Sequence, residues 1–133
     1  MPKRFLQFAA LNGLLAVLLG AFGAHALRGE LTADLMHAYE TAVQYHFWHA
    51  LALLFVSLLA IQNSDIPCLI SSGIFFALGL VLFSGSLYFL AISDIRYIAG
   101  MPVGLITPIG GLMFILAWLL LFIASLSFNH DLN

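Results

Sequence analysis

Residues 37–49 hold the densest group of side chains that could carry chemistry. Imidazole, carboxylate, amide and phenol groups follow one another there, and the candidates for a polar site are His37, Glu40, Gln44, Tyr45 and His49. Imidazole changes its charge near pH 6.5, so a site built on it can couple binding to protons. Glu40 can pair with His37, or with His25 from an earlier segment. The stretch therefore predicts a site for a small ligand or a partner.

A continuous helix must position these side chains, because neither proline nor glycine interrupts residues 33–62. At about 100° per residue, Glu40 and Gln44 share the face of His37. His46 points nearly the opposite way, so the histidines do not form one cluster on this helix.

The solvent around this helix must be lipid. Of the 133 residues, 63% are hydrophobic and only 8% are charged, whereas a soluble domain carries about 25% charged residues. A soluble chain of this length could not cover so much apolar surface. The net charge of −2 argues against nucleic acid as a partner. We expect an integral membrane protein in contact with membrane lipid, and no cofactor.

Four apolar segments are long enough to cross the bilayer, since about 20 helical residues span its hydrocarbon core. We expect an all-α integral membrane protein, with four transmembrane helices in an antiparallel bundle that forms a single membrane domain over residues 1–133. The second helix is long, and its first part, about 33–44, is amphipathic. The expected helices are about 5–27, 33–62, 66–91 and 107–126. Residues 94–106 are interrupted by Gly100 and Pro102, and we expect an interfacial loop that folds back over the bundle.

Local signals support these helix ends. Thr32 and Thr107 are expected N-caps, because a threonine hydroxyl can accept a hydrogen bond from a free N–H of the first turn. Pro67 and Pro108 suit a first helical turn, where a missing N–H is tolerated. Trp118, in contrast, is expected to anchor the fourth helix at the membrane interface.

Alternating helix directions bring polar groups from all four helices to one membrane face. The first helix adds His25 at its end, the third adds Ser84, Ser86 and Tyr88, and the fourth adds Thr107 at its start. The other half of the bundle offers mainly Asn12, Ser57, Ser71 and Ser72. The expected site is therefore one-sided.

Four motifs in order give the chain a specific resemblance. They are Gly20-Ala-Phe-Gly-Ala-His25, Thr41-Ala-Val-Gln-Tyr-His46 with His49, Leu82-Phe-Ser-Gly-Ser-Leu-Tyr88, and Ile106-Thr-Pro-Ile-Gly-Gly111 before Trp118. Over residues 5–126 the chain resembles the small membrane-protein family known as domain of unknown function four-twenty-three. That family includes uncharacterised bacterial inner-membrane proteins and an animal transmembrane relative. The resemblance implies a four-helix protein of the bacterial inner (plasma) membrane, and it implies no activity.

The basic residues set the expected orientation. Lys3 and Arg4 precede the first helix and place the amino terminus in the cytoplasm by the positive-inside rule. Four crossings return the carboxy terminus to the same side, so both termini are expected to be cytoplasmic.

The polar site has other interpretations. Glu40 could instead form an interfacial ion pair with Arg28 or Arg96. Three imidazoles would suit zinc or copper; those available are His25, His46 and His49. We expect no metal, because the separation of His46 and His49 is only fair for chelation.

A catalytic or haem site fits less well. Ser84 or Ser86 with a histidine base would resemble an intramembrane hydrolase, but no aspartate is positioned to orient the base. Haem held by His25 and His49 would need a larger pocket. We therefore expect no enzymatic activity.

A stripe of small residues runs along the first helix every four positions, at Ala16, Gly20 and Ala24. Such a stripe allows another helix to approach closely, from the same chain or from another subunit. We expect a homo-oligomer, with a partner membrane protein as a further possibility.

The sequence thus favours a non-enzymatic membrane protein that binds a small ligand or a partner protein at the one-sided polar site. The alternative is a small oligomeric channel or a proton-linked transporter. A path across the membrane needs polar groups in both halves, and the half that holds the termini has few. That asymmetry favours binding over transport.

Overall fold

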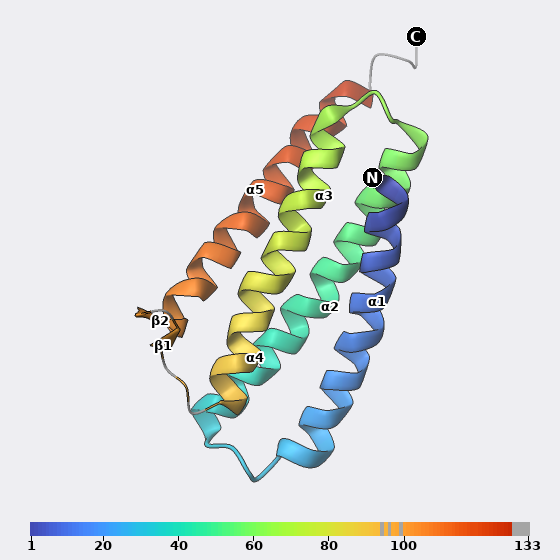
Figure 1. The fold of residues 1–133 in the computed structure, drawn as a ribbon. Coiled ribbons are helices and arrows are strands. Elements are labelled where there is room, and N and C mark those ends of the chain that lie inside the picture. Colours follow the sequence, from blue (N-terminus) through green and yellow to red (C-terminus); the bar gives the residue numbers. More distant parts are fainter. Residues whose placement is uncertain (94, 96, 99, 129–133) are drawn as a thin grey trace.

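A computed structural model describes residues 1–93, 95, 97–98 and 100–128. Four helical spans lie side by side in an elongated bundle (Figure 1), and each is long and apolar enough to cross a membrane. The first span is α1 (Pro2–Phe22) with a π-helix, Gly23–Leu27, and the second span is α2 (Ala33–Gln62). The third span is α3 (Pro67–Gly79), a second π-helix, Leu80–Ser84, and α4 (Gly85–Ile92). The fourth span is a 3-10 turn, Val103–Leu105, followed by α5 (Ile106–Ser127).

The bundle is antiparallel, as expected. The first span begins and α5 ends at the same end of the molecule (Figure 1). α1 packs mainly on α2, α2 also packs on the third span, and the third span packs on α5. The main core joins Leu53 and Val56 of α2 to Phe76 of α3 and Phe114 of α5. Large apolar side chains cover the outside, which suits a surface in contact with lipid.

The two π-helices change which side chains face inward. A π-turn holds one extra residue, so it rotates everything after it by about 100°. Tyr88 follows Phe76 by twelve residues, which in a regular α-helix places it about 120° away. With one residue absorbed in the π-turn, the difference falls to about 20°, and Tyr88 turns to the face of the buried Phe76.

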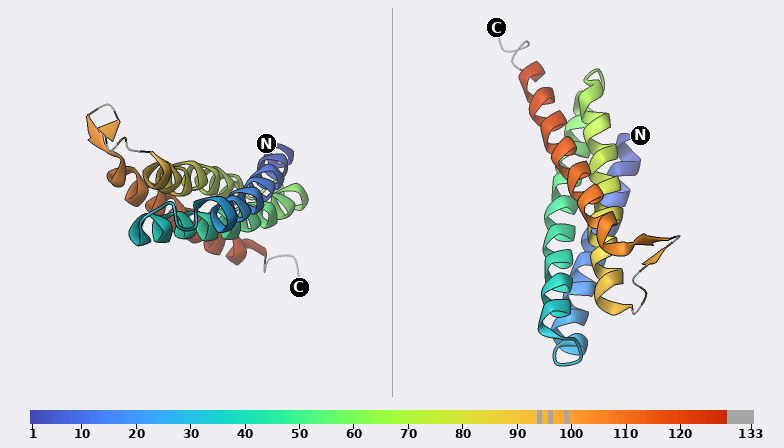
Figure 2. Two further views of the ribbon diagram at one scale, coloured as in Figure 1. Left: turned by 90° about the horizontal axis from the view of Figure 1, so that it is seen from below. Right: turned by 90° about the vertical axis from the view of Figure 1, so that its left-hand side faces the viewer.

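The connection before α5 differs from the expected loop. Two short strands, β1 (Tyr97–Ile98) and β2 (Met101–Pro102), pair antiparallel, and Gly100 has a φ of +80° at their turn. The hairpin extends sideways from the bundle and does not fold back over it (Figure 2). Strand pairing gives its backbone internal hydrogen-bond partners, so the segment needs no contact with the helices.

Two of the expected helix ends are confirmed and one is wrong. The Thr32 hydroxyl accepts a hydrogen bond from the Leu35 N–H at 3.4 Å, and Pro67 lies in the first turn of α3. α5 begins at Ile106, so Thr107 lies inside the helix and is not its N-cap. The Thr107 hydroxyl bonds to another helix instead.

Candidate functional site

A chain of hydrogen bonds links three spans inside the bundle. Nε2 of the buried His46 lies 2.9 Å from the Asn12 side-chain oxygen, and its Nδ1 lies 3.2 Å from the Tyr88 hydroxyl. The Asn12 amide nitrogen donates to the Phe8 carbonyl at 2.8 Å, which leaves the amide oxygen facing His46. That oxygen only accepts, so Nε2 donates and Nδ1 accepts from Tyr88. One neutral tautomer satisfies every partner.

The sequence did not predict this chain of hydrogen bonds. Sequence reasoning placed Asn12 among the polar groups of the other half of the bundle and considered His46 only as a metal candidate. The available signal was the direction of His46: it lies opposite the charged face of α2, and that direction is the core. The same inward face carries Tyr39, Ala42 and Leu53.

His49 is also buried and fully engaged. Its Nδ1 lies 2.8 Å from the Tyr45 carbonyl and donates to it, so Nε2 accepts from the Trp118 indole N–H at 3.3 Å. The ring stacks on Phe114 with centroids 3.6 Å apart. The role of Trp118 as an interfacial anchor stays a prediction, and its indole N–H in addition bonds to a histidine inside the bundle, a contact that the sequence did not predict.

The serine and threonine candidates form a second contact between helices. Ser86 and Thr107 hydroxyl oxygens lie 2.7 Å apart, and Ser86 also donates to the Phe83 carbonyl at 3.0 Å. The Ser84 hydroxyl is buried and has no hydrogen-bond partner within the described part of the chain. Neither serine bonds to a histidine there, so the pairing that a hydrolase would need is not formed.

The three metal candidates do not meet. His25 is exposed at the end of the first span, whereas His46 and His49 have both ring nitrogens in hydrogen bonds. No group of three histidine, cysteine or acidic side chains that could hold a metal occurs among the described residues.

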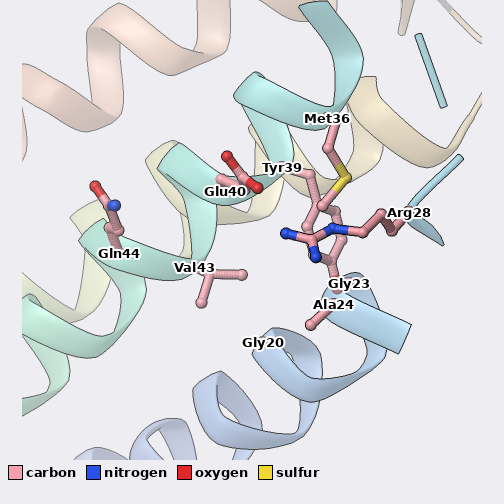
Figure 3. A pocket seen from close by; sticks show the side chains of 9 residues that line it. All are labelled: Gly20, Gly23, Ala24, Arg28, Met36, Tyr39, Glu40, Val43 and Gln44. Carbon is pink, nitrogen blue, oxygen red and sulfur yellow. The ribbon is translucent and has the colours of Figure 1, made fainter. Parts of the chain in front are cut away.

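A pocket of about 220 Å³ lies between the end of the first span and the start of α2 (Figure 3). It is lined by Gly20, Gly23, Ala24, Arg28, Met36, Tyr39, Glu40, Val43 and Gln44. Glu40 and Gln44 are predicted site residues, whereas His25 and His37 do not line the pocket. Sequence reasoning missed Tyr39 and Arg28 as members of this site.

Glycines on the first span explain why the two walls of the pocket approach each other closely. A side chain on Gly20 would meet Val43 at 3.2 Å, and one on Gly23 would overlap the Tyr39 ring. The Tyr39 hydroxyl donates to the Leu19 carbonyl at 2.6 Å and ties α2 to α1. The absence of side chains at Gly20 and Gly23 therefore lets Val43 and the Tyr39 ring of α2 pack directly against the first span.

The same geometry changes the interpretation of the small-residue stripe. Gly20 contacts α2, and both Gly20 and Ala24 line a pocket within one chain. The stripe therefore meets a helix of the same chain and gives no basis for subunit contact. The homo-oligomer stays a prediction.

Two opposite charges share the pocket without pairing directly. The side chain of Arg28 reaches from the end of the first span toward α2, where Glu40 lies (Figure 3). No ion pair closer than 4.0 Å joins them among the described residues. Arg96, the other expected partner of Glu40, lies outside the described residues, and so does the carboxy-terminal His130.

A second hollow, of about 520 Å³, lies between α2, the third span and α5. Its walls are mostly aromatic and apolar, and they include Tyr45, Phe83 and Trp118. The imidazole of His49 also lines it and has both ring nitrogens in hydrogen bonds, so this hollow offers fewer free polar groups than the first one.

Comparison with known proteins finds one family model and close relatives that cover nearly the whole chain. Residues 19–111 match the family model described as "Protein of unknown function (DUF423)". The chain is 42% identical over 126 residues to the UPF0382 membrane protein YwdK of Bacillus subtilis, covering 95% of this chain and 98% of that one. It is 41% identical over 127 residues to the UPF0382 inner membrane protein YgdD of Escherichia coli, covering 95% and 92%. No solved structure matches the chain.

Proposed function

This chain belongs to the DUF423 family of membrane proteins, and we propose that it is a non-enzymatic protein that binds a small amphiphilic ligand between the first span and α2. One observation carries this proposal: the pocket places a cation and a carboxylate over a floor of glycine and apolar side chains. Concave sites with an apolar lining and a few polar groups are where small molecules bind.

The hydrogen bonds of the interior histidines, compared with the two charges of the pocket, support the same conclusion. His46 and His49 already have partners at both ring nitrogens. Arg28 and Glu40 do not pair with each other, so they keep their bonding capacity for a ligand. Binding is therefore expected at the pocket, and the interior histidines are expected to position the helices.

The alternative is a small oligomeric channel or a proton-linked transporter. It would need polar groups available along the half of the bundle that holds the termini. In that half the hydroxyls of Ser57, Ser71 and Ser72 donate to the carbonyls of Leu54, Pro67 and Ala117. Because the protons of these hydroxyls are already donated within the bundle, few donors are left in this half for a path of water or ions, which favours binding over transport.

We also propose an orientation. Lys3 and Arg4 lie at the end of the bundle opposite the pocket, and the positive-inside rule places them in the cytoplasm. The pocket would then lie at the outer face of the bacterial inner membrane, with both termini on the cytoplasmic side.

The experiment is native mass spectrometry of the protein released from gentle detergent, with bound amphiphiles identified from the same sample. Ala24→Leu adds bulk to a residue that lines the pocket, and Ala21→Leu adds the same bulk to an exposed position of the first span outside it. We expect Ala24→Leu to remove a bound amphiphile that the wild type and Ala21→Leu retain.

Equal binding by both variants would contradict the proposed site. The alternative is tested separately, with the protein reconstituted in liposomes. Dissipation of an imposed proton gradient by the wild type, and its loss in a pocket variant, would favour transport.

A further inference from the structure

We propose that the pocket recognises a zwitterionic headgroup that joins a primary ammonium to a phosphate, carried by a membrane phospholipid of the phosphatidylethanolamine type. This inference rests on the proposed function, because it names the ligand class of the same pocket.

The charges of the pocket select such a headgroup. The guanidinium of Arg28 offers a planar fork of N–H donors that matches two phosphate oxygens. The carboxylate of Glu40 only accepts, and an ammonium offers it three donors. Because both groups line one hollow of about 220 Å³, a ligand that carries both charges can contact both at once.

Ligands with a single charge fit less well. A purely anionic headgroup meets the repulsion of Glu40, and a purely cationic group meets that of Arg28. A choline headgroup carries a positive charge but has no N–H to donate to the carboxylate. The pocket therefore favours a primary ammonium with a phosphate nearby.

The surroundings indicate a lipid and not a water-soluble zwitterion. Phe22, beside the pocket residue Gly23, is 48% exposed, and Phe47, one turn beyond Val43, is 39% exposed. These aromatic side chains belong to the surface that faces lipid in a membrane protein. Met36 and Val43 add apolar walls inside the pocket. An acyl chain that leaves the pocket would meet this apolar surface, whereas a soluble ligand would gain nothing from it.

The test uses the full chain in detergent, titrated with phosphatidylethanolamine, phosphatidylglycerol or phosphatidylcholine of matched acyl chains and read by native mass spectrometry. We expect the wild type to prefer phosphatidylethanolamine over phosphatidylglycerol by about tenfold, since one charged hydrogen bond is at stake. Soluble phosphoethanolamine should compete weakly, because it lacks the acyl chains.

Three variants separate the contributions of the two charges. Glu40→Gln should lower the preference for phosphatidylethanolamine to about onefold while binding persists. Arg28→Gln should weaken the binding of all three phospholipids, because each carries a phosphate. Glu30→Gln is the matched control, since Glu30 is exposed in the connection before α2 and does not line the pocket. Circular dichroism of each variant checks that the helices form.

The outcomes distinguish this inference from the proposed function. Suppose that Ala24→Leu blocks lipid binding. If the wild type then shows no preference for phosphatidylethanolamine, or if Glu40→Gln has the same preference as the wild type, the headgroup inference is wrong and the proposed pocket stands. If Ala24→Leu leaves phospholipid binding unchanged, both are wrong. Tight binding of soluble phosphoethanolamine, equal to that of the lipid, would overturn the assignment to a membrane lipid.

Discussion

Gly110 of α5 lies against the backbone of the third span, and Gly110→Ala tests whether the helices approach as closely as described. A methyl group built there would lie 2.7 Å from the Phe83 Cα and 2.8 Å from the Leu82 carbonyl carbon. Carbon atoms in favourable contact are about 3.5–4.0 Å apart. The neighbour is backbone and cannot rotate away, so α5 must move outward by about 1 Å to restore normal contact.

The expected magnitude follows from three contributions. Overpacking of this kind destabilises by about 1–3 kcal/mol. Outward movement of α5 also strains the bond between the Ser86 and Thr107 hydroxyls, 2.7 Å long, whose loss costs about 1 kcal/mol. The higher helix propensity of alanine returns about 1 kcal/mol. We expect Gly110→Ala to lower the free energy of unfolding by about 2 kcal/mol.

The next residue supplies the control. A methyl group on Gly111 would meet only the Phe83 ring, at 3.7 Å, which is ordinary contact. Gly111→Ala should therefore leave the free energy of unfolding unchanged or raise it by up to about 1 kcal/mol. The assay is reversible unfolding by SDS in mixed micelles, followed by circular dichroism. Equal effects of the two substitutions, or a Gly110→Ala protein as stable as the wild type, would refute the close approach of α5.

Two further predictions use the same unfolding assay. Ser84→Ala should leave the free energy of unfolding unchanged or raise it by up to about 1 kcal/mol, because the buried Ser84 hydroxyl has no partner within the described part of the chain. The control is Ser72→Ala, which breaks a 2.8 Å bond to the Ala117 carbonyl and should cost about 1 kcal/mol. A clear loss of stability in Ser84→Ala would contradict the unpaired state of its hydroxyl. Asn12→Leu and His46→Leu should each cost about 2 kcal/mol by leaving a buried partner unsatisfied, and the double variant should cost less than their sum by about 1 kcal/mol. Strict additivity would contradict a direct bond between these two residues.

Hydropathy made the four-helix class predictable, because about 20 apolar residues in helical form have few alternatives in a bilayer. The side-chain site was less predictable. The side-chain directions of residues 33–62 could be predicted, because that helix is uninterrupted. In the first and third spans each π-turn adds a rotation of about 100° that the sequence does not announce. Tyr88 was predicted as a polar-site residue from its position along the third helix, whereas its bond to His46 depends on such a turn.

The hairpin shows a second limit of the sequence. Its apolar residues suggested burial against the bundle, because an exposed apolar loop is unfavourable in water. A loop beside a membrane has another apolar surface available, the lipid itself. Tyr97, 66% exposed, can therefore extend sideways without loss. Hydropathy alone does not distinguish contact with protein from contact with lipid.

The contrast between paired and unpaired polar groups separates structure from binding in this protein. In a bilayer an unpaired polar group is costly, so polar side chains buried among the helices tend to have partners, and the Ser84 hydroxyl is the exception within the described part of the chain. His46 and His49 follow that rule, and their bonds connect α2 to three other helices. Arg28 and Glu40 lie at the end of the bundle, where water and headgroups are available, and they can stay apart. If these two charges served only stability, the Arg28 guanidinium and the Glu40 carboxylate would be expected to form an ion pair. Two separated opposite charges beside an apolar surface are what a zwitterionic ligand requires.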